Sequence, residues 1–187
     1  VIAHTPLEGT VVLASTGFCG RELYALGDRA NQLYMVGSMG CVTTLALGLA
    51  LARPDLRVVA LDGDGAALMR MGAFATLGAY GPSNLVHLLL DNASHDSTGA
   101  QATVSPSVSF AGVAAASGYA LALEGDTLDV VEALFDARTA SLSEGPRFAC
   151  LSTRPGTPDG LPRPKVTPET VRARLMDHIA QRAPASA

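Results

Sequence analysis

Two polar side chains stand where two apolar segments of the chain end. Asp64 lies in a Gly-Asp-Gly turn directly after the apolar segment 58–61, and Asn92 follows the next apolar segment, 85–90. Residues 66–79 between them are mostly small or apolar, as expected of a helix that crosses from one strand to a parallel neighbour. Because parallel strands joined in this way end at one edge of a sheet, we expect Asp64 and Asn92 to lie close together.

The Gly-Asp-Gly turn has the features of a site for a metal ion and a diphosphate. Gly63 and Gly65 allow the backbone to turn sharply and to approach a ligand closely. The helix that begins at Ala66 directs free N–H groups to the same place, which favours an anion. The Asp64 carboxylate would repel a bare phosphate, and a divalent cation such as Mg²⁺ removes this conflict by bridging the two. Asn92 offers a second oxygen ligand.

Two other interpretations of the turn stay open at this point. An ordinary connection between a strand and a helix can also contain Gly-Asp-Gly without binding anything. A dinucleotide-binding loop of the Rossmann type would need a further glycine at the position where the chain has Leu68. The combined pattern of strand, turn, helix, strand and Asn92 favours the metal–diphosphate site.

This combination resembles the cofactor motif of thiamine diphosphate enzymes, in which Gly-Asp-Gly is followed across a helix and a strand by Asn-Asn. The chain departs from the motif at Asp91, which stands where the family has the first asparagine. The resemblance implies that Mg²⁺ is bound by Asp64, Asn92 and the main-chain carbonyl of Ser94. The cofactor contacts that it implies at the turn itself are Gly63, Asp64, Gly65 and Ala66.

A glycine-containing loop follows the first apolar segment, residues 11–15, and precedes a helix expected at residues 21–26. This is again a strand, a loop and a helix, so the N–H groups of the loop should face the same edge of the sheet. The matching loop of thiamine diphosphate enzymes contacts the cofactor's diphosphate. The resemblance therefore implies backbone contacts from Gly17, Phe18 and Cys19, although each of them also fits a plain connection.

The loop after the short apolar segment 34–36 matches the position that lies against the aminopyrimidine ring in the same family. The resemblance implies that the Gly37 carbonyl accepts a hydrogen bond from the 4′-amino group, with Ser38 beside it. Met39 would wedge between the two rings of the cofactor, a role that suits its flexible, polarizable thioether. Without the resemblance, a methionine at this place is more simply a core residue.

The segment after the second strand of the motif is unusually polar for residues that leave a buried strand. His95, Asp96, Ser97 and Thr98 should lie at the edge where α/β sheets bind ligands, so each is a candidate contact for substrate or diphosphate. His95 is the candidate catalytic group in this chain, because imidazole titrates near neutral pH. Arg21 and His95 are candidates for binding a second acid group on the substrate. A capped, solvated loop is the alternative.

Composition limits the partners and the compartment. Hydrophobic residues make up 48% of the 187 residues and charged residues 16%, which is enough apolar material for a large core. The net charge of −4 gives no sign of nucleic acid or of an anionic membrane surface as a partner. Three distant cysteines and the lack of a long apolar segment favour a reduced, cytoplasmic compartment and no membrane span.

Apolar segments that alternate with helical ones predict an α/β fold, with a doubly wound, mostly parallel six-stranded sheet covered by helices on both faces. We expect residues 1–155 to form the cofactor-binding domain, and residues 156–187 to form a linker rich in Pro and Gly and a C-terminal helix. Continuous helices are expected at residues 66–79 and 127–140. This fold matches the pyrophosphate-binding domain of thiamine diphosphate enzymes.

The resemblance also implies a partner chain. Thiamine diphosphate enzymes need a second domain of similar size, the pyrimidine-binding domain, which supplies a Glu that acts on N1′ of the cofactor. A chain of 187 residues leaves no room for that domain. We therefore expect an alpha-type partner subunit that carries it, an active site at the interface, and an assembly of α₂β₂ or larger.

Within the family, residues 16–24, 36–40 and 91–101 resemble phosphonopyruvate and sulfopyruvate decarboxylases. The resemblance implies a 2-oxo acid decarboxylase that converts phosphonopyruvate to phosphonoacetaldehyde and CO₂, as in phosphonate antibiotic biosynthesis. Sulfopyruvate is the alternative substrate, because its decarboxylase typically has separate chains of about this size. An acetolactate synthase-like carboligase and a non-catalytic nucleotide-binding module are two further alternatives.

Overall fold

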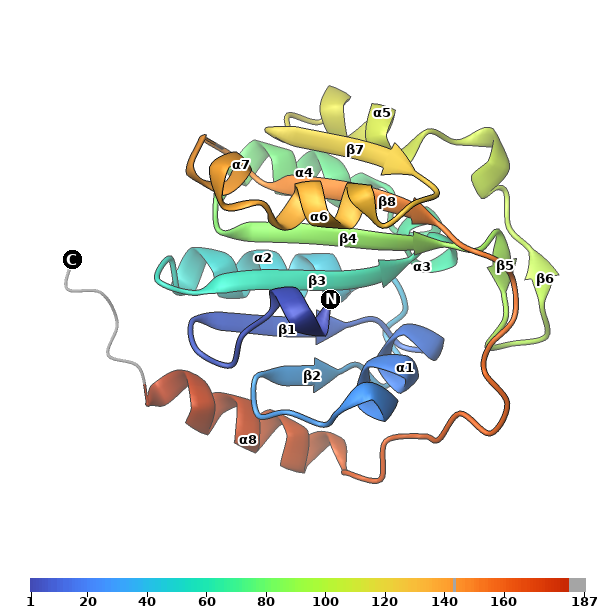
Figure 1. Cartoon of the computed structure of the whole chain (residues 1–187), viewed down its shortest axis with the longest axis horizontal. Helices are drawn as coiled ribbons and strands as arrows, with labels where there is room; N and C mark the ends of the chain where they lie inside the picture. The colour runs from blue at the N-terminus through green and yellow to red at the C-terminus, as the bar shows by residue number, and fades with distance from the viewer. Residues whose placement is uncertain (143, 182–187) are drawn as a thin grey trace.

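The computed structural model describes residues 1–142 and 144–181, and a six-stranded sheet runs through the middle of them (Figure 1). Its strands are β1 (Thr10–Ala14), β2 (Gln32–Tyr34), β3 (Arg57–Gly63), β4 (Leu85–Asp91), β7 (Leu121–Gly125) and β8 (Arg147–Ser152). They lie in the order β2-β1-β3-β4-β8-β7, and every neighbouring pair is parallel. The expected doubly wound parallel sheet is therefore confirmed, and all the strands end at the same edge.

Helices cover both faces of the sheet because the strands are apolar on both sides. In β1, Val11 and Leu13 pack into one core cluster, and Val12 and Ala14 pack into the other. The first cluster includes side chains of α2 (Val42–Ala52), α4 (Gly72–Tyr80) and α5 (Phe110–Ala116). The second includes α1 (Phe18–Leu26) and α6 (Asp129–Phe135), which lie in front of the sheet in Figure 1.

The C-terminal helix, α8 (Pro168–Ala180), lies beside the edge strand β2. Its buried side chain Leu175 belongs to the first core cluster, and Val171 belongs to the second. Arg174 forms two hydrogen bonds of 2.7 and 2.8 Å with the Asp28 carboxylate, which in turn accepts a hydrogen bond from Tyr34. Residues 153–167, which connect β8 to α8, contain no helix or strand, as expected for a linker.

The helix expected at 66–79 is interrupted, which corrects the sequence interpretation. α3 (Asp64–Met69) ends at Arg70, whose backbone leaves the helical region at φ −132° and ψ 41°, and α4 begins two residues later. The interruption has a packing reason. α3 stays at the edge of the sheet where the strands end, and α4 packs on the sheet itself through Phe74 and Leu77.

The helix expected at 127–140 is also two helices, α6 and α7 (Ala137–Leu142). Asp136 separates them because its carboxylate accepts the backbone N–H of Arg138 at 2.7 Å and so caps the second helix. The strand expected at 34–36 lies two residues earlier, and Val36 is exposed.

The remaining elements are short. The polar segment after β4 forms a small antiparallel hairpin, β5 (Ser94–His95) with β6 (Gln101–Ala102), which the sequence did not predict. Two 3₁₀ turns, η1 (Ile2–His4) and η2 (Ser105–Ser107), complete the set. No helix in the part of the chain that the structure describes is long and apolar enough to cross a membrane.

Candidate functional site

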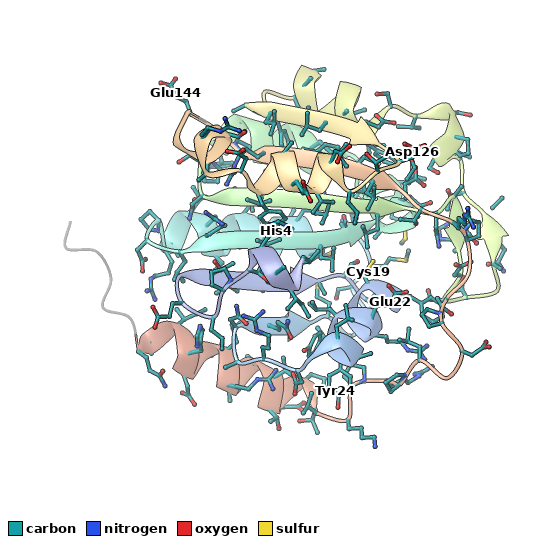
Figure 2. The ribbon with its side chains drawn as sticks, in the orientation of Figure 1. His4, Cys19, Glu22, Tyr24, Asp126 and Glu144 are labelled. Carbon is teal, nitrogen blue, oxygen red and sulfur yellow. The ribbon has the colours of Figure 1, made fainter. Side chains whose placement is uncertain are left out.

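A cavity of about 250 Å³ opens at the edge where the strands end. Its walls are the loops after β1 and β3, the start of the segment after β4, and the connecting segment after β8, which runs down this edge in Figure 1. Figure 2 shows Cys19 and Glu22 on α1 near the same edge. The predicted site residues that line the cavity are Gly17, Phe18, Cys19, Met39, Gly63, Asp64, Gly65, Ala66, Asn92, Asp96 and Ser97, whereas the candidate Thr98 does not line it.

Asp64 is the first residue of α3 and is buried, with 3% of its surface exposed. Its carboxylate accepts a hydrogen bond of 2.6 Å from the Thr103 hydroxyl. Burial raises the pKa of Asp64, and the nearby negative charge of Asp91 raises this pKa further, while the Thr103 hydrogen bond opposes both effects. A divalent cation beside Asp64 would supply the positive charge that this buried carboxylate lacks.

The Asn92 amide is held in one orientation by two neighbours. Its Nδ2 donates to Asp96 Oδ2 at 2.8 Å, and its Oδ1 accepts the Ser94 N–H at 3.1 Å. Because the amide nitrogen of Asn92 donates to Asp96, the amide oxygen is the atom that could bind a metal ion. Among residues 1–142 and 144–181, no three His, Cys, Asp or Glu side chains gather as a metal site. A cation here would therefore need amide and main-chain oxygens besides Asp64.

Asp91, which departs from the Asn-Asn motif, does not line the cavity. Its Oδ1 accepts the Ser105 hydroxyl at 2.7 Å and the Ala93 N–H at 2.9 Å. The Ser105 hydroxyl oxygen lies 3.1 Å from that of Thr103, the residue that donates its proton to Asp64. The two hydroxyl groups therefore stand between the two carboxylates, and the departure leaves the candidate ligand Asn92 in place.

The turn at residues 63–65 is supported from inside the sheet. Asp62 Oδ1 accepts the Gly63 N–H at 3.0 Å. His87 Nε2 lies 3.7 Å from Asp62 Oδ2, and each of these two side chains is 1% exposed. This buried pair was not expected from the sequence, and its Asp62 directly precedes the turn that carries Asp64.

Two glycines bring the cavity walls close together. A Cβ atom built on Gly65 would lie 2.4 Å from the His95 ring and 3.3 Å from Met39 Cε. At Gly17, where φ is +99°, a Cβ atom would lie 3.3 Å from Ser97 Oγ. The predicted contacts Met39 and His95 therefore both pack against the glycine turn, although His95 itself is not a lining residue.

Two features of the lining fit a bound anion rather than an empty packing defect. The Ser15 hydroxyl is buried and has no hydrogen-bond partner among the described residues, and Ser15 lines the cavity. Burial raises the pKa of the Cys19 thiol to about 12, and its Sγ contacts the Asp62 carbonyl at 3.6 Å. Cys19 is therefore neutral and adds no negative charge. The residues present fit a diphosphate held through a cation.

Other predicted residues lie outside the lining. Gly37 and Ser38 are exposed, and the Gly37 N–H donates to Thr16 Oγ1 at 3.3 Å, which ties two loops of the site together. Ser94 belongs to β5 and does not line the cavity. Arg21 is not a lining residue, because its guanidinium donates to the carbonyls of Leu161 and Pro162 and lies 4.8 Å from the centre of the Phe18 ring.

No candidate site residue was expected in the connecting segment after β8, yet this segment reaches the cavity. Thr153, Arg154, Gly156 and Thr157 all line the cavity. The signal that could have found them is the fold rule itself, since β8 ends at the same edge as β3 and β4 and the residues after it must pass the site. Glu22 is also a lining residue that was missed.

Comparison with known proteins gives concordant matches. Residues 21–149 match the family described as thiamine pyrophosphate enzyme, C-terminal TPP binding domain. A phosphonopyruvate decarboxylase of Streptomyces viridochromogenes is 50% identical over 94% of this chain and 43% of its own length. The sulfopyruvate decarboxylase subunit beta of Methanothermobacter thermautotrophicus is 39% identical over 82% of this chain and 78% of its own length.

The chain therefore spans less than half the length of the Streptomyces relative and most of the length of the Methanothermobacter subunit. Among solved structures, the thiamine diphosphate-dependent 4-hydroxybenzoylformate decarboxylase of Rhodococcus jostii matches with a TM-score of 0.64 at 19% identity. The match covers 81% of this chain and 31% of that one. At this identity the likeness shows a shared fold.

Proposed function

The chain belongs to the family of the C-terminal TPP-binding domain of thiamine pyrophosphate enzymes, and from this premise we propose that it binds thiamine diphosphate through Mg²⁺. The observation that carries the proposal is the placement of Asp64 and Asn92 at adjacent strand ends, beside one cavity. Asp64, the Asn92 amide oxygen and the Ser94 carbonyl would hold the cation. The backbone of Gly17, Phe18 and Cys19 would receive the diphosphate.

The proposed reaction is the decarboxylation of a 2-oxo acid, with phosphonopyruvate as the first candidate and phosphonoacetaldehyde and CO₂ as products. The similarity at 50% identity to a phosphonopyruvate decarboxylase supports this choice. Sulfopyruvate is the second candidate, and the specific observation in its favour is the length. The chain covers 78% of a sulfopyruvate decarboxylase beta subunit, against 43% of the phosphonopyruvate decarboxylase.

When bound, thiamine diphosphate supplies the electron sink that allows a 2-oxo acid to lose CO₂. This chain would orient the cofactor. Asp64 and Asn92 would hold the diphosphate end, and Met39, which packs against Gly65, would contact the rings. The polar hairpin with His95 stands at the same edge. Glu22 lines the cavity, and burial raises its pKa, so it is a poorer anion than a surface glutamate.

The catalytic Glu that acts on N1′ is proposed to come from a partner chain with a pyrimidine-binding domain, in an α₂β₂ or larger assembly. One surface supports such a partner. α2 contains no charged residue, leaves Leu45 and Leu51 45% and 48% exposed, and begins directly after the Gly37–Met39 loop. An apolar surface that continues from the exposed part of the site fits a permanent protein interface.

Binding and turnover of the assembled protein test the proposal. The chain, mixed with its pyrimidine-binding partner, should bind thiamine diphosphate only when Mg²⁺ is present, as measured by calorimetry. Asp64→Ala should abolish this binding, and Asp177→Ala, which removes an exposed carboxylate on α8, should leave it unchanged. Cofactor binding that does not depend on Mg²⁺ or on Asp64 would refute the metal–diphosphate site.

The reaction is tested with the same preparation. CO₂ release should require both chains and should be faster with one of phosphonopyruvate and sulfopyruvate than with the other. Turnover of neither acid by protein that binds the cofactor would remove the decarboxylase assignment and leave the cofactor site intact. A product with two joined keto acids would instead identify a carboligase.

A further inference from the structure

We propose that Arg154 binds the second acid group of the substrate, a phosphonate or sulfonate, at the rim of the cavity. The inference rests on the proposed decarboxylation of an acidic 2-oxo acid. Arg154 is the one Lys or Arg side chain among the lining residues, all of which the structure describes. It lies on the connecting segment after β8, to which the sequence analysis assigned no role.

The backbone around Arg154 is held at the cavity from both sides. The Thr153 N–H, just before it, donates to the Asp91 carbonyl at 2.7 Å. The Gly156 N–H, just after Pro155, donates to Asp96 Oδ2 at 2.8 Å. Pro155 further restricts the backbone between these anchors. Arg154 therefore projects from a fixed backbone position, although its own side chain is exposed.

The Arg154 guanidinium makes no hydrogen bond or ion pair with the described residues, whereas the other arginine near the site is occupied. Arg21, the cation chosen from the sequence, donates to the carbonyls of Leu161 and Pro162 and thereby anchors the same segment from outside the cavity. Arg154 keeps its donors for a ligand. A guanidinium matches two oxygens of a tetrahedral phosphonate or sulfonate in a bidentate way.

Charge explains why the site needs this cation. Glu22, Asp64 and Asp96 all line the cavity, and a bound diphosphate would add further negative charge. Mg²⁺ would offset the charge at Asp64, and Asp96 already accepts hydrogen bonds from Asn92, Ser94 and Gly156. A substrate with two acid groups would still meet a negative surface. Arg154 at the rim reverses this repulsion for the acid group that is not lost as CO₂.

The test uses the assembled enzyme with thiamine diphosphate and Mg²⁺, and compares Arg154→Gln, Arg154→Lys and the control Arg163→Gln. Arg163 is an exposed arginine on the same connecting segment but not in the cavity lining. Arg154→Gln should raise KM for the preferred two-acid substrate about 10- to 100-fold, the size expected for loss of charge-assisted hydrogen bonds. Arg154→Lys should lie between Arg154→Gln and wild type, and the control should match wild type.

Two further measurements separate this role from others. Pyruvate, which lacks the second acid group, should bind to Arg154→Gln as it does to wild type, as a substrate or as a competitor. The dissociation constant of thiamine diphosphate should also be unchanged. A matching rise in that constant would make Arg154 a diphosphate ligand, and a matching loss for pyruvate would make it a structural residue. An unchanged KM for the two-acid substrate would equally overturn the proposal.

The inference can fail separately from the proposed function. Phosphonoacetate and sulfoacetate carry the second acid group but no keto group, so calorimetry with them needs no turnover. If wild-type holoenzyme turns over neither keto acid yet binds one of these anions, and Arg154→Gln loses that binding, the decarboxylase assignment falls and the anion site stands. Equal binding to wild type and Arg154→Gln removes the anion site, whatever the reaction proves to be.

Discussion

Asp91 shows how one residue of a motif can change while the site is kept. Its carboxylate accepts hydrogen bonds from Ser105 and Ala93 rather than lining the cavity, and the hydroxyl groups of Ser105 and Thr103 lie between it and Asp64. A carboxylate so close to Asp64 raises the pKa of that group. We infer that this arrangement increases the benefit of a cation, because Mg²⁺ would relieve the repulsion between two neighbouring negative charges.

Asp96 is the residue on which the geometry of Asn92 depends, and this leads to a first prediction. Asp96 Oδ2 accepts hydrogen bonds from both Asn92 Nδ2 and the Gly156 N–H. Asp96→Asn replaces this charged acceptor by a neutral amide oxygen, which weakens the hydrogen bond that orients the Asn92 amide. We expect Mg²⁺ to bind about 10-fold more weakly in the presence of thiamine diphosphate, the usual scale for residues that orient a metal ligand. Calorimetric titration with Mg²⁺ measures this.

Asp159→Asn is the matched control, since Asp159 is an exposed carboxylate on the same connecting segment. It should leave Mg²⁺ affinity unchanged. The interpretation of Asp96 would be wrong if both variants bound Mg²⁺ as wild type does. A lower melting temperature in Asp96→Asn with unchanged Mg²⁺ affinity would assign Asp96 a purely structural role.

At the scale of elements, the contact between α4 and the loop after α5 depends on one glycine. A Cβ atom on Gly78 would lie 1.7 Å from the Ser117 carbonyl oxygen, a backbone atom that cannot move aside without shifting the chain. We expect Gly78→Ala to lower the free energy of unfolding by about 1–3 kcal/mol, as for other overpacked sites. Urea titration measures the change.

Gly48→Ala in α2 provides the control, because nothing lies within 4 Å of a Cβ atom at that position. It should be neutral, or stabilising by up to about 1 kcal/mol, since alanine favours a helix over glycine. If Gly78→Ala behaved like Gly48→Ala, the close approach of α4 to Ser117 would be refuted.

The docking of α8 on the edge strand should depend on pH. Hydrogen bonds from Arg174, and then from Tyr34, lower the pKa of Asp28 below its ordinary value of 3.8. A carboxyl group whose folded pKa lies below the unfolded one stabilises the fold above the unfolded pKa. This contribution is lost as the pH falls through the folded pKa. Wild type should therefore melt at a higher temperature than Asp28→Asn at neutral pH.

The difference in melting temperature between wild type and Asp28→Asn should shrink as the pH is lowered below about 4. Asp177→Asn, at an exposed carboxylate on the same helix, should show no such difference at either pH. A wild-type advantage over Asp28→Asn that persisted unchanged at low pH would contradict the assigned pair with Arg174.

At the scale of the whole molecule, the proposed partner sets a prediction about assembly. Activity should rise as partner is added and level off at equal amounts of the two chains, in a complex with at least two copies of each. Leu45→Glu places a charge on the exposed apolar side of α2 and should weaken this assembly without unfolding the chain. Light scattering of the mixture measures the complex directly.

Leu128→Glu is the control for that substitution, because Leu128 is 68% exposed at the start of α6, on the opposite face of the sheet. It should assemble as wild type does. Full activity of the chain without any partner, or assembly of Leu45→Glu equal to that of Leu128→Glu, would overturn this view of the α2 surface.

The sequence by itself determined the parallel sheet and the placement of the candidate ligands Asp64 and Asn92 at one edge of it. Each of these depends on local pattern: apolar strands, a Gly-Asp-Gly turn, and an Asn at the end of the next strand. Parallel strands joined by helices bring such positions to one edge whatever the details of packing are. That is why Asp64 and Asn92 could be paired, and why loop residues such as Gly17 and Met39 could be added.

The tertiary structure alone decided which polar side chains reach the cavity. Nothing in the sequence distinguishes Arg21 from Arg154 as a candidate substrate ligand. In the structure, Arg21 donates to backbone carbonyls of the connecting segment, whereas Arg154 lines the cavity. The helix break at Arg70 and the buried Asp62–His87 pair are also products of long-range packing. Local pattern fixes where a strand ends, but contacts between distant segments fix what surrounds that end.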